Sequence, residues 1–262
     1  MKTQDIINHI VSWLKDYAAK AGVSGFVVGV SGGIDSAVSS ALAARTGMPV
    51  LCVEMPIHQP HAQVSRAWEH IDGLQRRYNN VQAVSVNLTP LFDQFIATLP
   101  KAVSSEENDR ALVNTRARLR MTTLYYFAQL HGRLVVGTGN KVEDFGVGFY
   151  TKYGDGGVDL SPIADLVKTE VYELGRALQV PQSILEAKPT DGLWGDDRSD
   201  EDQIGASYPE LEWAMAYQTG TGQDGELNER QKEVLEIYKR LNRINKHKME
   251  PIPVCVIPEE LK

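Results

Sequence analysis

The sequence has little cysteine and no long hydrophobic run. Only Cys52 and Cys255 are cysteines among 262 residues, which excludes a multi-cysteine zinc site and a Cys-x-x-Cys redox pair. Both lie in apolar, strand-like segments, so we expect two reduced thiols in the core. No apolar run approaches the roughly 20 residues that span a membrane. The amphipathic residues 3–20 lack a signal-peptide cleavage site, so a cytoplasmic location is expected.

An excess of positive charge is also missing. Asp and Glu (34 residues) outnumber Lys and Arg (27 residues), and the formal net charge is −7. Nonspecific binding to nucleic acid relies on several basic side chains that neutralise phosphates, so we expect no nucleic-acid partner. The sequence contains no internal repeat, and 42% of its residues are hydrophobic. Its length and composition therefore predict a single domain over residues 1–262.

Short β-rich runs alternate with amphipathic helical patterns along the chain. Strands are predicted at residues 26–30, 50–55, 81–87 and 134–137. Apolar residues at three- and four-residue spacing predict helices at 3–20, 36–46, 61–78, 90–99, 107–131, 166–179 and 228–246. This alternation predicts an α/β fold with a doubly wound parallel sheet flanked by helices. Ligands in such folds bind beyond the carboxyl ends of the strands.

The most informative segment lies between the first predicted strand and the next helix. It reads Gly29-Val30-Ser31-Gly32-Gly33-Ile34-Asp35-Ser36. A strand, a loop of small residues and a helix leave backbone N–H groups unpaired at the positive end of the helix dipole, which favours phosphate. The glycines allow close approach and positive φ, and the two serines can donate hydroxyl hydrogen bonds. The simpler alternative is a Gly/Ser-rich helix cap that binds no ligand.

Asp35 distinguishes this loop from other phosphate-binding loops. A carboxylate would repel phosphate unless a cation lies between them, so Asp35 is predicted to bind Mg²⁺ together with phosphate oxygens. The Lys of a Walker-type loop is missing, which disfavours γ-phosphate transfer. Glu143, shortly after the turn Gly137-Thr138-Gly139, is the predicted partner ligand. Its spacing fits a solvent-exposed acid in a first helical turn equally well.

Two motifs give the sequence a family resemblance. The loop pattern Ser-Gly-Gly-x-Asp-Ser resembles that of the N-type ATP pyrophosphatases, which cleave ATP between the α- and β-phosphates. The run Thr151-Lys152-Tyr153-Gly154-Asp155-Gly156-Gly157 narrows the resemblance to the ammonia-dependent NAD synthetases, which convert deamido-NAD (nicotinic acid adenine dinucleotide) into NAD. The resemblance covers nearly the whole chain. Further matching segments lie at residues 114–121, 168–171, 188–190 and 247–248.

The resemblance implies roles for individual residues. The first loop would contact ATP together with Thr138, Lys168 and Thr190, and Asp35 and Glu143 would hold Mg²⁺. Contacts with deamido-NAD are implied for Arg118, Lys152, Asp159, His247 and Lys248. Basic side chains suit the pyrophosphate and carboxylate of that substrate, and an acidic one suits a ribose hydroxyl. Without the motif, each basic residue would be interpreted as a solvated surface charge.

The implied reaction is an amidation in two steps. The nicotinate carboxylate of deamido-NAD attacks the α-phosphorus of ATP, giving an acyl adenylate and pyrophosphate, and ammonia then attacks the carbonyl carbon and releases AMP. Lys168 is predicted to balance charge on the departing pyrophosphate. Asp155 is predicted to bind ammonium and accept its proton. The chain lacks the length and the cysteine for the amidase domain of glutamine-dependent relatives, so free ammonia is the expected donor unless a separate subunit supplies it.

Some features depart from the family pattern or extend it. Gly139-Asn140-Lys141-Val142 stands where many members have Asp-His-Ala-Ala, and one extra residue lies between Glu143 and Lys152. The path of residues 139–151 is therefore left open, as are adenine contacts near residues 55–61. The long segment 188–208, with an acidic run, is either a solvated loop or an active-site lid.

The resemblance also implies a homodimer with deamido-NAD near the subunit interface. Residues 107–131 form the candidate interface helix, with burial in the monomer core as the alternative. Three other functions stay open: a tRNA-modifying ATP pyrophosphatase, a module like that of GMP synthetase, and a nucleotide sensor without turnover. Pyrophosphate release that depends on deamido-NAD would separate all three from NAD synthesis.

Overall fold

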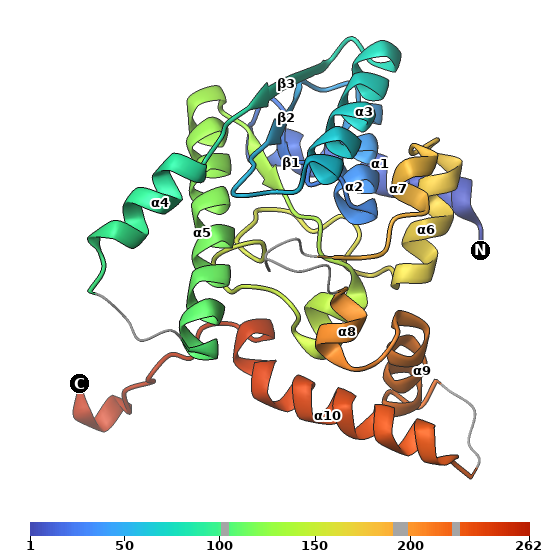
Figure 1. Cartoon of the computed structure of the whole chain (residues 1–262), viewed down its shortest axis with the longest axis vertical. Helices are drawn as coiled ribbons and strands as arrows, with labels where there is room; N and C mark the ends of the chain where they lie inside the picture. The colour runs from blue at the N-terminus through green and yellow to red at the C-terminus, as the bar shows by residue number, and fades with distance from the viewer. Residues whose placement is uncertain (101–104, 191–198, 222–225) are drawn as a thin grey trace.

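A parallel sheet lies in the upper part of the molecule in the view of Figure 1. The structure is a computed structural model that describes residues 1–100, 105–190, 199–221 and 226–262. Its four strands are β1 (Phe26–Gly29), β2 (Val50–Glu54), β3 (Val81–Ser85) and β4 (Leu134–Val136). They lie in the order β3-β2-β1-β4, and every pairing is parallel. The predicted α/β fold with a parallel sheet is confirmed.

The seven predicted helices are all present, with ends shifted by no more than three residues. The α-helices of the described residues are α1 (Thr3–Ala21), α2 (Ile34–Arg45), α3 (His61–Arg77), α4 (Thr89–Thr98), α5 (Glu106–His131), α6 (Lys168–Ala177), α7 (Gln182–Leu185), α8 (Asp200–Ile204), α9 (Tyr208–Gln218) and α10 (Glu229–Met249). A π-helix, η1 (Val142–Val147), and a 3₁₀-helix, η2 (Glu259–Leu261), complete them. Helices α7, α8 and α9 and the π-helix were not predicted.

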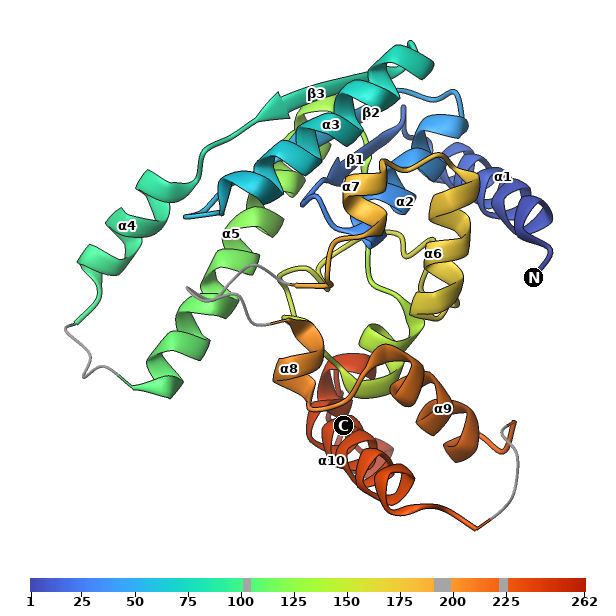
Figure 2. The same cartoon turned by 45° about the vertical axis from the view of Figure 1, so that its right-hand side comes forward.

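Helices cover both faces of the sheet, as Figures 1 and 2 show. Phe26 and Val28 of β1 pack with α1, α2, α3 and α6 on one face. Val27, between them in sequence, packs with α4 and α5 on the other face. Successive side chains of a strand point to opposite faces, so β1 needs apolar residues at every position. This explains why the first strand is a continuous apolar run rather than an alternating one.

A second helical cluster lies apart from the sheet (Figure 2). Helices α8, α9 and α10 pack with η1 around Leu211, Val234 and Tyr238. Their ends follow from local sequence: Ser207 and Asn228 each begin a helix in a capping box with the residue three positions on. The apolar residues of α9 are not confined to one face, which is why periodicity alone did not predict this helix.

One expectation about the cysteines is wrong. Cys52 is buried in β2, but Cys255 is exposed. The segment around Cys255 reads like a strand because of its valines, yet it forms no strand in the structure, and Val254 and Val256 are about four-fifths exposed. No helix among the described residues has both the length and the apolar content to cross a membrane.

Candidate active site

A cavity of about 280 Å³ opens at the carboxyl ends of β1, β2 and β4. Its lining includes all of residues 29–36, together with Met55 after β2 and Thr138 after β4. Helices α5, α6 and α8 contribute Arg120, Lys168 and Asp200 to the walls. This is the position that a doubly wound sheet predicts for a ligand.

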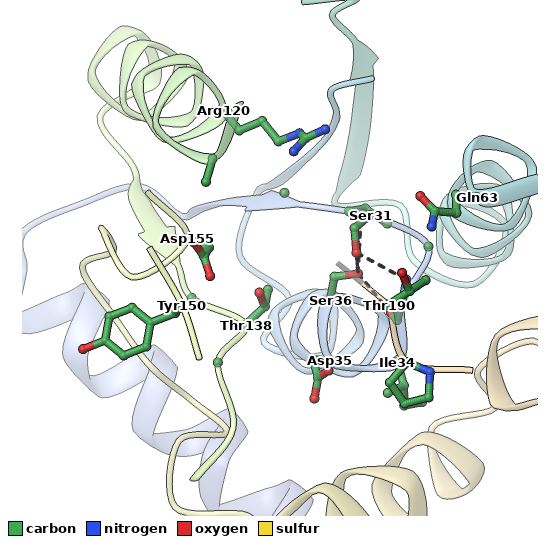
Figure 3. A pocket seen from close by; sticks show the side chains of 18 of the residues that line it. Ser31, Ile34, Asp35, Ser36, Gln63, Arg120, Thr138, Tyr150, Asp155 and Thr190 are labelled. Atoms are coloured by element: carbon green, nitrogen blue, oxygen red, sulfur yellow. Dashed lines mark hydrogen bonds between the residues drawn. The ribbon is translucent and has the colours of Figure 1, made fainter. Parts of the chain in front are cut away.

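Residues 29–36, which we call the phosphate loop, are held by their own serines. The Ser36 hydroxyl donates to the Gly33 carbonyl (3.0 Å) and accepts from the Ser31 amide (3.2 Å). The two serine hydroxyls are 3.1 Å apart and face each other in Figure 3. No side chain of the described residues caps α2 after Gly33, so the first N–H groups of this helix remain available for an anion.

Positive φ occurs at Gly32 alone among the glycines of this loop. Its φ is +85°, while Gly33 has a φ of −95° in the extended region, and Gly29 is not in the left-handed region. A Cβ on Gly32 would lie 2.5 Å from the carbonyl oxygen of Gln63, on α3. Gly32 is therefore required twice, by its backbone conformation and by the close approach of α3.

The structure brings Asp35 and Glu143 to one cation, the Lys168 ammonium. Lys168 Nζ donates to Asp35 Oδ2 at 2.5 Å and to Glu143 Oε1 at 3.1 Å, and only 3% of the residue is exposed. Burial by itself would lower the pKa of Lys168, but the two carboxylates outweigh it and hold that pKa above its ordinary value. Tyr208 adds a hydroxyl that donates to Glu143 Oε1 at 2.5 Å.

The carboxylates of Asp35 and Glu143 could supply some of the oxygen ligands that Mg²⁺ needs. Carboxylate oxygens from separate elements converge here, and Mg²⁺ is commonly held by one or two carboxylates with substrate phosphates and water. The described residues contain no group of three or more acidic, His or Cys side chains that could hold a metal by themselves. A divalent cation at Asp35 and Glu143 would therefore depend on ligands that arrive with the nucleotide.

Asn140 and the π-helix define the backbone path within residues 139–151, which could not be predicted from the sequence. The π-helix takes up more residues per turn than an α-helix, and η1 lies where one extra residue separates Glu143 from Lys152. The buried Asn140 accepts from the amides of Val142 and Glu143 (3.1 and 3.2 Å) at the start of η1. Its Nδ2 donates to Asp35 Oδ1 at 3.3 Å, so one side chain joins the phosphate loop to Glu143.

Two further acids line the cavity beyond Thr138. Asp155 belongs to the glycine-rich loop, and its Oδ1 accepts from the Thr151 amide at 2.9 Å. Desolvation by the surrounding cavity walls raises the pKa of Asp155 to about 6 and, with help from neighbouring carboxylates, the pKa of Asp144 to about 7. In Figure 3 Asp155 and Tyr150 lie on the side of the cavity opposite Gln63.

Four of the five residues implied to bind deamido-NAD come together. The Arg118 guanidinium donates to the Lys152 carbonyl at 3.4 Å, and Lys152 Nζ donates to the His247 carbonyl at 2.5 Å. Lys248 Nζ donates to the carbonyls of Gly148 and Tyr150 (2.9 and 2.8 Å). His247 takes part through its backbone carbonyl, and none of the four residues lines the cavity itself.

Asp159 lies apart from that group. Its Oδ2 accepts from the Val135 amide at 2.8 Å, and its Oδ1 accepts from the Tyr125 hydroxyl at 2.9 Å. It borders a different, shallower surface cleft together with Trp13 and Tyr17 of α1. Its contact with substrate stays a prediction.

The segment predicted as a lid is described only in part. Lys188 and Thr190, near the start of this segment, line the cavity. Asp200, at the start of α8, lines the cavity as well. Asp196 and Asp197, in the predicted acidic run, lie outside the described residues. Whether this segment closes over a ligand stays a prediction.

Comparison with known sequences decides the family. The model of a family described as NAD synthase matches residues 6–252 of this chain. The chain belongs to the NAD synthase family. The resemblance predicted from the loop and from residues 151–157 is thereby confirmed.

Individual members of the family match this chain over nearly its full length. The NH(3)-dependent NAD(+) synthetase of Mesoplasma florum is 36% identical, with 100% of this chain and 99% of that protein covered. The structure of NMN synthetase from Francisella tularensis superimposes with a TM-score of 0.84 at 32% identity, covering 99% of both chains. NH3-dependent NAD synthetase from Campylobacter jejuni has a TM-score of 0.76, 24% identity and coverage of 98% and 100%, and supports the fold.

Several residues that line the cavity of this chain were not predicted. Arg120 donates to the Met55 carbonyl at 2.9 Å and to Gln59 Oε1 at 2.8 Å, beside the phosphate loop. Ala117, Arg120, Met121 and Leu124 all line the cavity at the spacing of one helix face, a signal that was present in the sequence. Tyr208 carried no such signal, because only the packing of α9 brings it to Glu143.

Proposed function

We propose that this chain catalyses the ATP-dependent amidation of deamido-NAD with ammonia, giving NAD, AMP and pyrophosphate through an acyl adenylate. It acts as one domain of residues 1–262 and as a ligase that forms a C–N bond, the enzyme class expected for its family. The observation that carries the proposal is one cavity that combines an uncapped phosphate loop with two carboxylates held by a buried lysine.

The first step uses the phosphate loop and Lys168. The N–H groups at the start of α2 bind phosphate oxygens of ATP, and Thr138 and Thr190 contact the nucleotide from other walls of the cavity. The nicotinate carboxylate attacks the α-phosphorus, the bond to the β-phosphate oxygen breaks, and pyrophosphate leaves. Lys168 keeps its proton and balances the charge that accumulates on the leaving group.

Asp35 and Glu143 are the residues that would hold Mg²⁺. When bound, the ion would neutralise phosphate charge and polarise the α-phosphoryl group. The chain keeps both carboxylates in place through Lys168, Asn140 and Tyr208. ATP is the co-substrate, so phosphate and water would supply the remaining ligands of the ion.

The second step uses Asp155. Ammonia attacks the carbonyl carbon of the acyl adenylate, the bond to AMP breaks, and one proton leaves the nitrogen. Desolvation at the cavity wall raises the pKa of Asp155 to about 6, so its carboxylate is a better proton acceptor than an ordinary aspartate while remaining mostly ionised at pH 7. Free ammonia is the proposed nitrogen donor.

Deamido-NAD is proposed to bind along the group that contains Arg118, Lys152, His247 and Lys248, with Asp159 as a further contact. The chain is proposed to act as a homodimer whose interface lies nearby. Tyr126 and Leu130 of α5 are more than half exposed, and Leu91 of α4 and Leu99 just after it are exposed as well, an apolar face that a second copy would cover. A cytoplasmic location stays part of the proposal.

A second candidate substrate is suggested by one similar structure. The Francisella structure, similar over 99% of both chains, is named NMN synthetase, so the mononucleotide of nicotinic acid is the alternative acceptor of the amide nitrogen. Both substrates present the same nicotinate carboxylate to ATP. They differ in the adenylate half, which the group around Arg118 would recognise only in the dinucleotide.

Substrate-dependent pyrophosphate release tests the proposal. The purified chain should release pyrophosphate from ATP only with Mg²⁺, ammonium and deamido-NAD together, with NAD identified by mass spectrometry. Asp35→Asn, which removes one proposed metal ligand, should abolish release. Preference for nicotinate mononucleotide would favour the second candidate, ATP binding without turnover would favour a sensor, and robust turnover with glutamine alone would contradict free ammonia as the donor.

A further inference from the structure

Arg66 of α3 lies beside the phosphate loop. It follows Gln63 by three residues, so the two side chains share one face of the helix, and both line the cavity. The Arg66 Nε donates to the Gly32 carbonyl across a long 3.4 Å. Within the described part of the chain this is the one hydrogen bond of a guanidinium that carries five N–H donors, and Arg66 forms no ion pair there. Both of its Nη groups therefore remain available for an anion.

The other basic side chains that line the described cavity differ from Arg66. Lys168 shares its charge between two carboxylates. Arg120 donates to a backbone carbonyl and to a glutamine side chain. Lys188 is exposed at the far end of the lining, near Thr190. Arg66 thus combines a half-buried position against the loop with a charge that no carboxylate of the described residues neutralises.

The direction of attack on ATP places the leaving group near α3. Asp155 and Tyr150 lie on the side of the cavity opposite Gln63 in Figure 3, and the proposed amidation takes place on the Asp155 side. In phosphoryl transfer the attacking and leaving oxygens are roughly in line, on opposite sides of phosphorus. A carboxylate that attacks from the Asp155 side therefore drives pyrophosphate toward α3, where Arg66 contacts Gly32.

We infer that Arg66 is a catalytic residue that binds the β- and γ-phosphates of ATP and neutralises charge on pyrophosphate as it leaves. The inference rests on the proposed function for its reaction. When the bond from the α-phosphorus to the bridging oxygen breaks, its electron pair stays on that oxygen and adds negative charge to pyrophosphate. The two Nη groups of a guanidinium match a pair of phosphate oxygens, while Nε keeps its contact with Gly32.

The binding test compares two products of the reaction, inorganic pyrophosphate and AMP, by calorimetric titration with Mg²⁺ present. Arg66→Gln should raise the Kd for pyrophosphate about tenfold or more, the scale of hydrogen bonds to a charged group. The Kd for AMP should stay within about twofold, because AMP keeps only the α-phosphate. Arg66→Lys, which keeps the charge but loses the planar fork, should raise the Kd for pyrophosphate by a smaller factor.

Arg76→Gln is the matched control, because Arg76 is an exposed arginine in the last turn of the same helix. It should change neither Kd. An unchanged Kd for pyrophosphate in Arg66→Gln, or equal weakening of pyrophosphate and AMP, would overturn the inference. Equal weakening of pyrophosphate by the Arg76 and Arg66 substitutions would overturn it as well, since net charge alone would then account for the loss.

Steady-state kinetics separates this inference from the proposed function. With deamido-NAD and ammonium saturating, Arg66→Gln should lower kcat/KM for ATP about 30-fold, with part of the loss in kcat because charge on the leaving group grows in the transition state. The KM values for deamido-NAD and ammonium should stay within about twofold. Selective loss of pyrophosphate binding in a chain whose wild type makes no NAD would contradict the proposed function and support the phosphate contact. Normal kcat/KM for ATP in Arg66→Gln would overturn the catalytic role.

Discussion

The two loops that meet in the cavity are built in different ways. The phosphate loop is local: Ser31 and Ser36 bond to each other and to Gly33 within five residues of sequence. The second loop, residues 137–157, depends on distant elements, because Lys168 contacts Glu143 and Asn140 reaches Asp35 across 105 residues. Local hydrogen bonds make a motif recognisable in sequence, whereas long-range contacts leave little local pattern.

Removing Lys168, which joins the two loops through Asp35 and Glu143, has the largest expected effect. Lys168→Met should lower kcat/KM at least 1,000-fold, roughly 4 kcal/mol of transition-state stabilisation, because it also leaves two partly buried carboxylates without their cation. Pyrophosphate release and thermal unfolding with and without Mg²⁺ measure both effects. Lys141→Met is the control, since Lys141 pairs with the exposed Asp165 at 2.8 Å. Equal losses in the two variants would contradict the special role of Lys168.

The next largest effect is expected inside the phosphate loop. Gly32→Ala should lower kcat/KM at least 100-fold and the free energy of unfolding by about 3 kcal/mol, since the new methyl group meets the Gln63 carbonyl at a positive φ. Urea unfolding of Gly33→Ala is the matched control for stability. Gly33 has an extended backbone, and a Cβ added to it would lie 3.4 Å from its nearest neighbour, Ser31 Oγ. Similar destabilisation by both substitutions would show that φ and contact do not decide the outcome.

The third prediction concerns His70, a titratable residue that contacts α2, the helix that begins in the phosphate loop. His70 is fully buried under α2, its Nε2 is 2.9 Å from Ser40 Oγ, and burial, aided by Arg77, lowers its pKa to about 4. Because the pKa of His70 is lower in the folded than in the unfolded chain, neutral His70 stabilises the fold at pH values above the unfolded pKa. This stabilisation is lost as the pH falls from about 6.5 toward 4. The loss attributable to His70 should approach roughly 3 kcal/mol.

Urea unfolding at pH 7.5, 6 and 5 checks this. His70→Gln removes the titrating ring, so its stability should fall less steeply over this range than that of wild type. His9→Gln on α1 serves as the exposed control. Parallel pH profiles for wild type and His70→Gln would contradict the prediction.

The smallest expected effect concerns the second loop. Tyr208→Phe removes the hydroxyl that donates to Glu143 and should lower kcat/KM about tenfold, the scale of one hydrogen bond to a charged group. The folded state should remain, because the ring stays in its helical cluster. Tyr217→Phe on the same helix is the control, and steady-state kinetics with varied Mg²⁺ is the measurement. If Tyr208→Phe lowered kcat/KM more than Gly32→Ala does, the contact of the second loop would matter more for activity than the phosphate loop.

Prediction from the sequence succeeded where one segment carries the whole pattern. The four strands and seven long helices follow from apolar periodicity, and residues 29–36 and 151–157 were sufficient to indicate the family. Prediction failed at Cys255, because a strand-like run needs a neighbouring strand that this segment does not have. It missed α9, whose apolar residues are not confined to one face.

The fold class, the family and the phosphate loop can be predicted from the sequence, because backbone propensities and short-range hydrogen bonds operate within a few residues. Three contacts depend on the folded chain: Lys168 bridges Asp35 and Glu143, Tyr208 donates to Glu143, and Asp144 packs against Gly139. Those contacts connect separate elements, and their geometry depends on how the helical cluster packs against the sheet. Charge in a buried site is organised by that packing, so the position of each acid cannot be predicted from its neighbours in sequence.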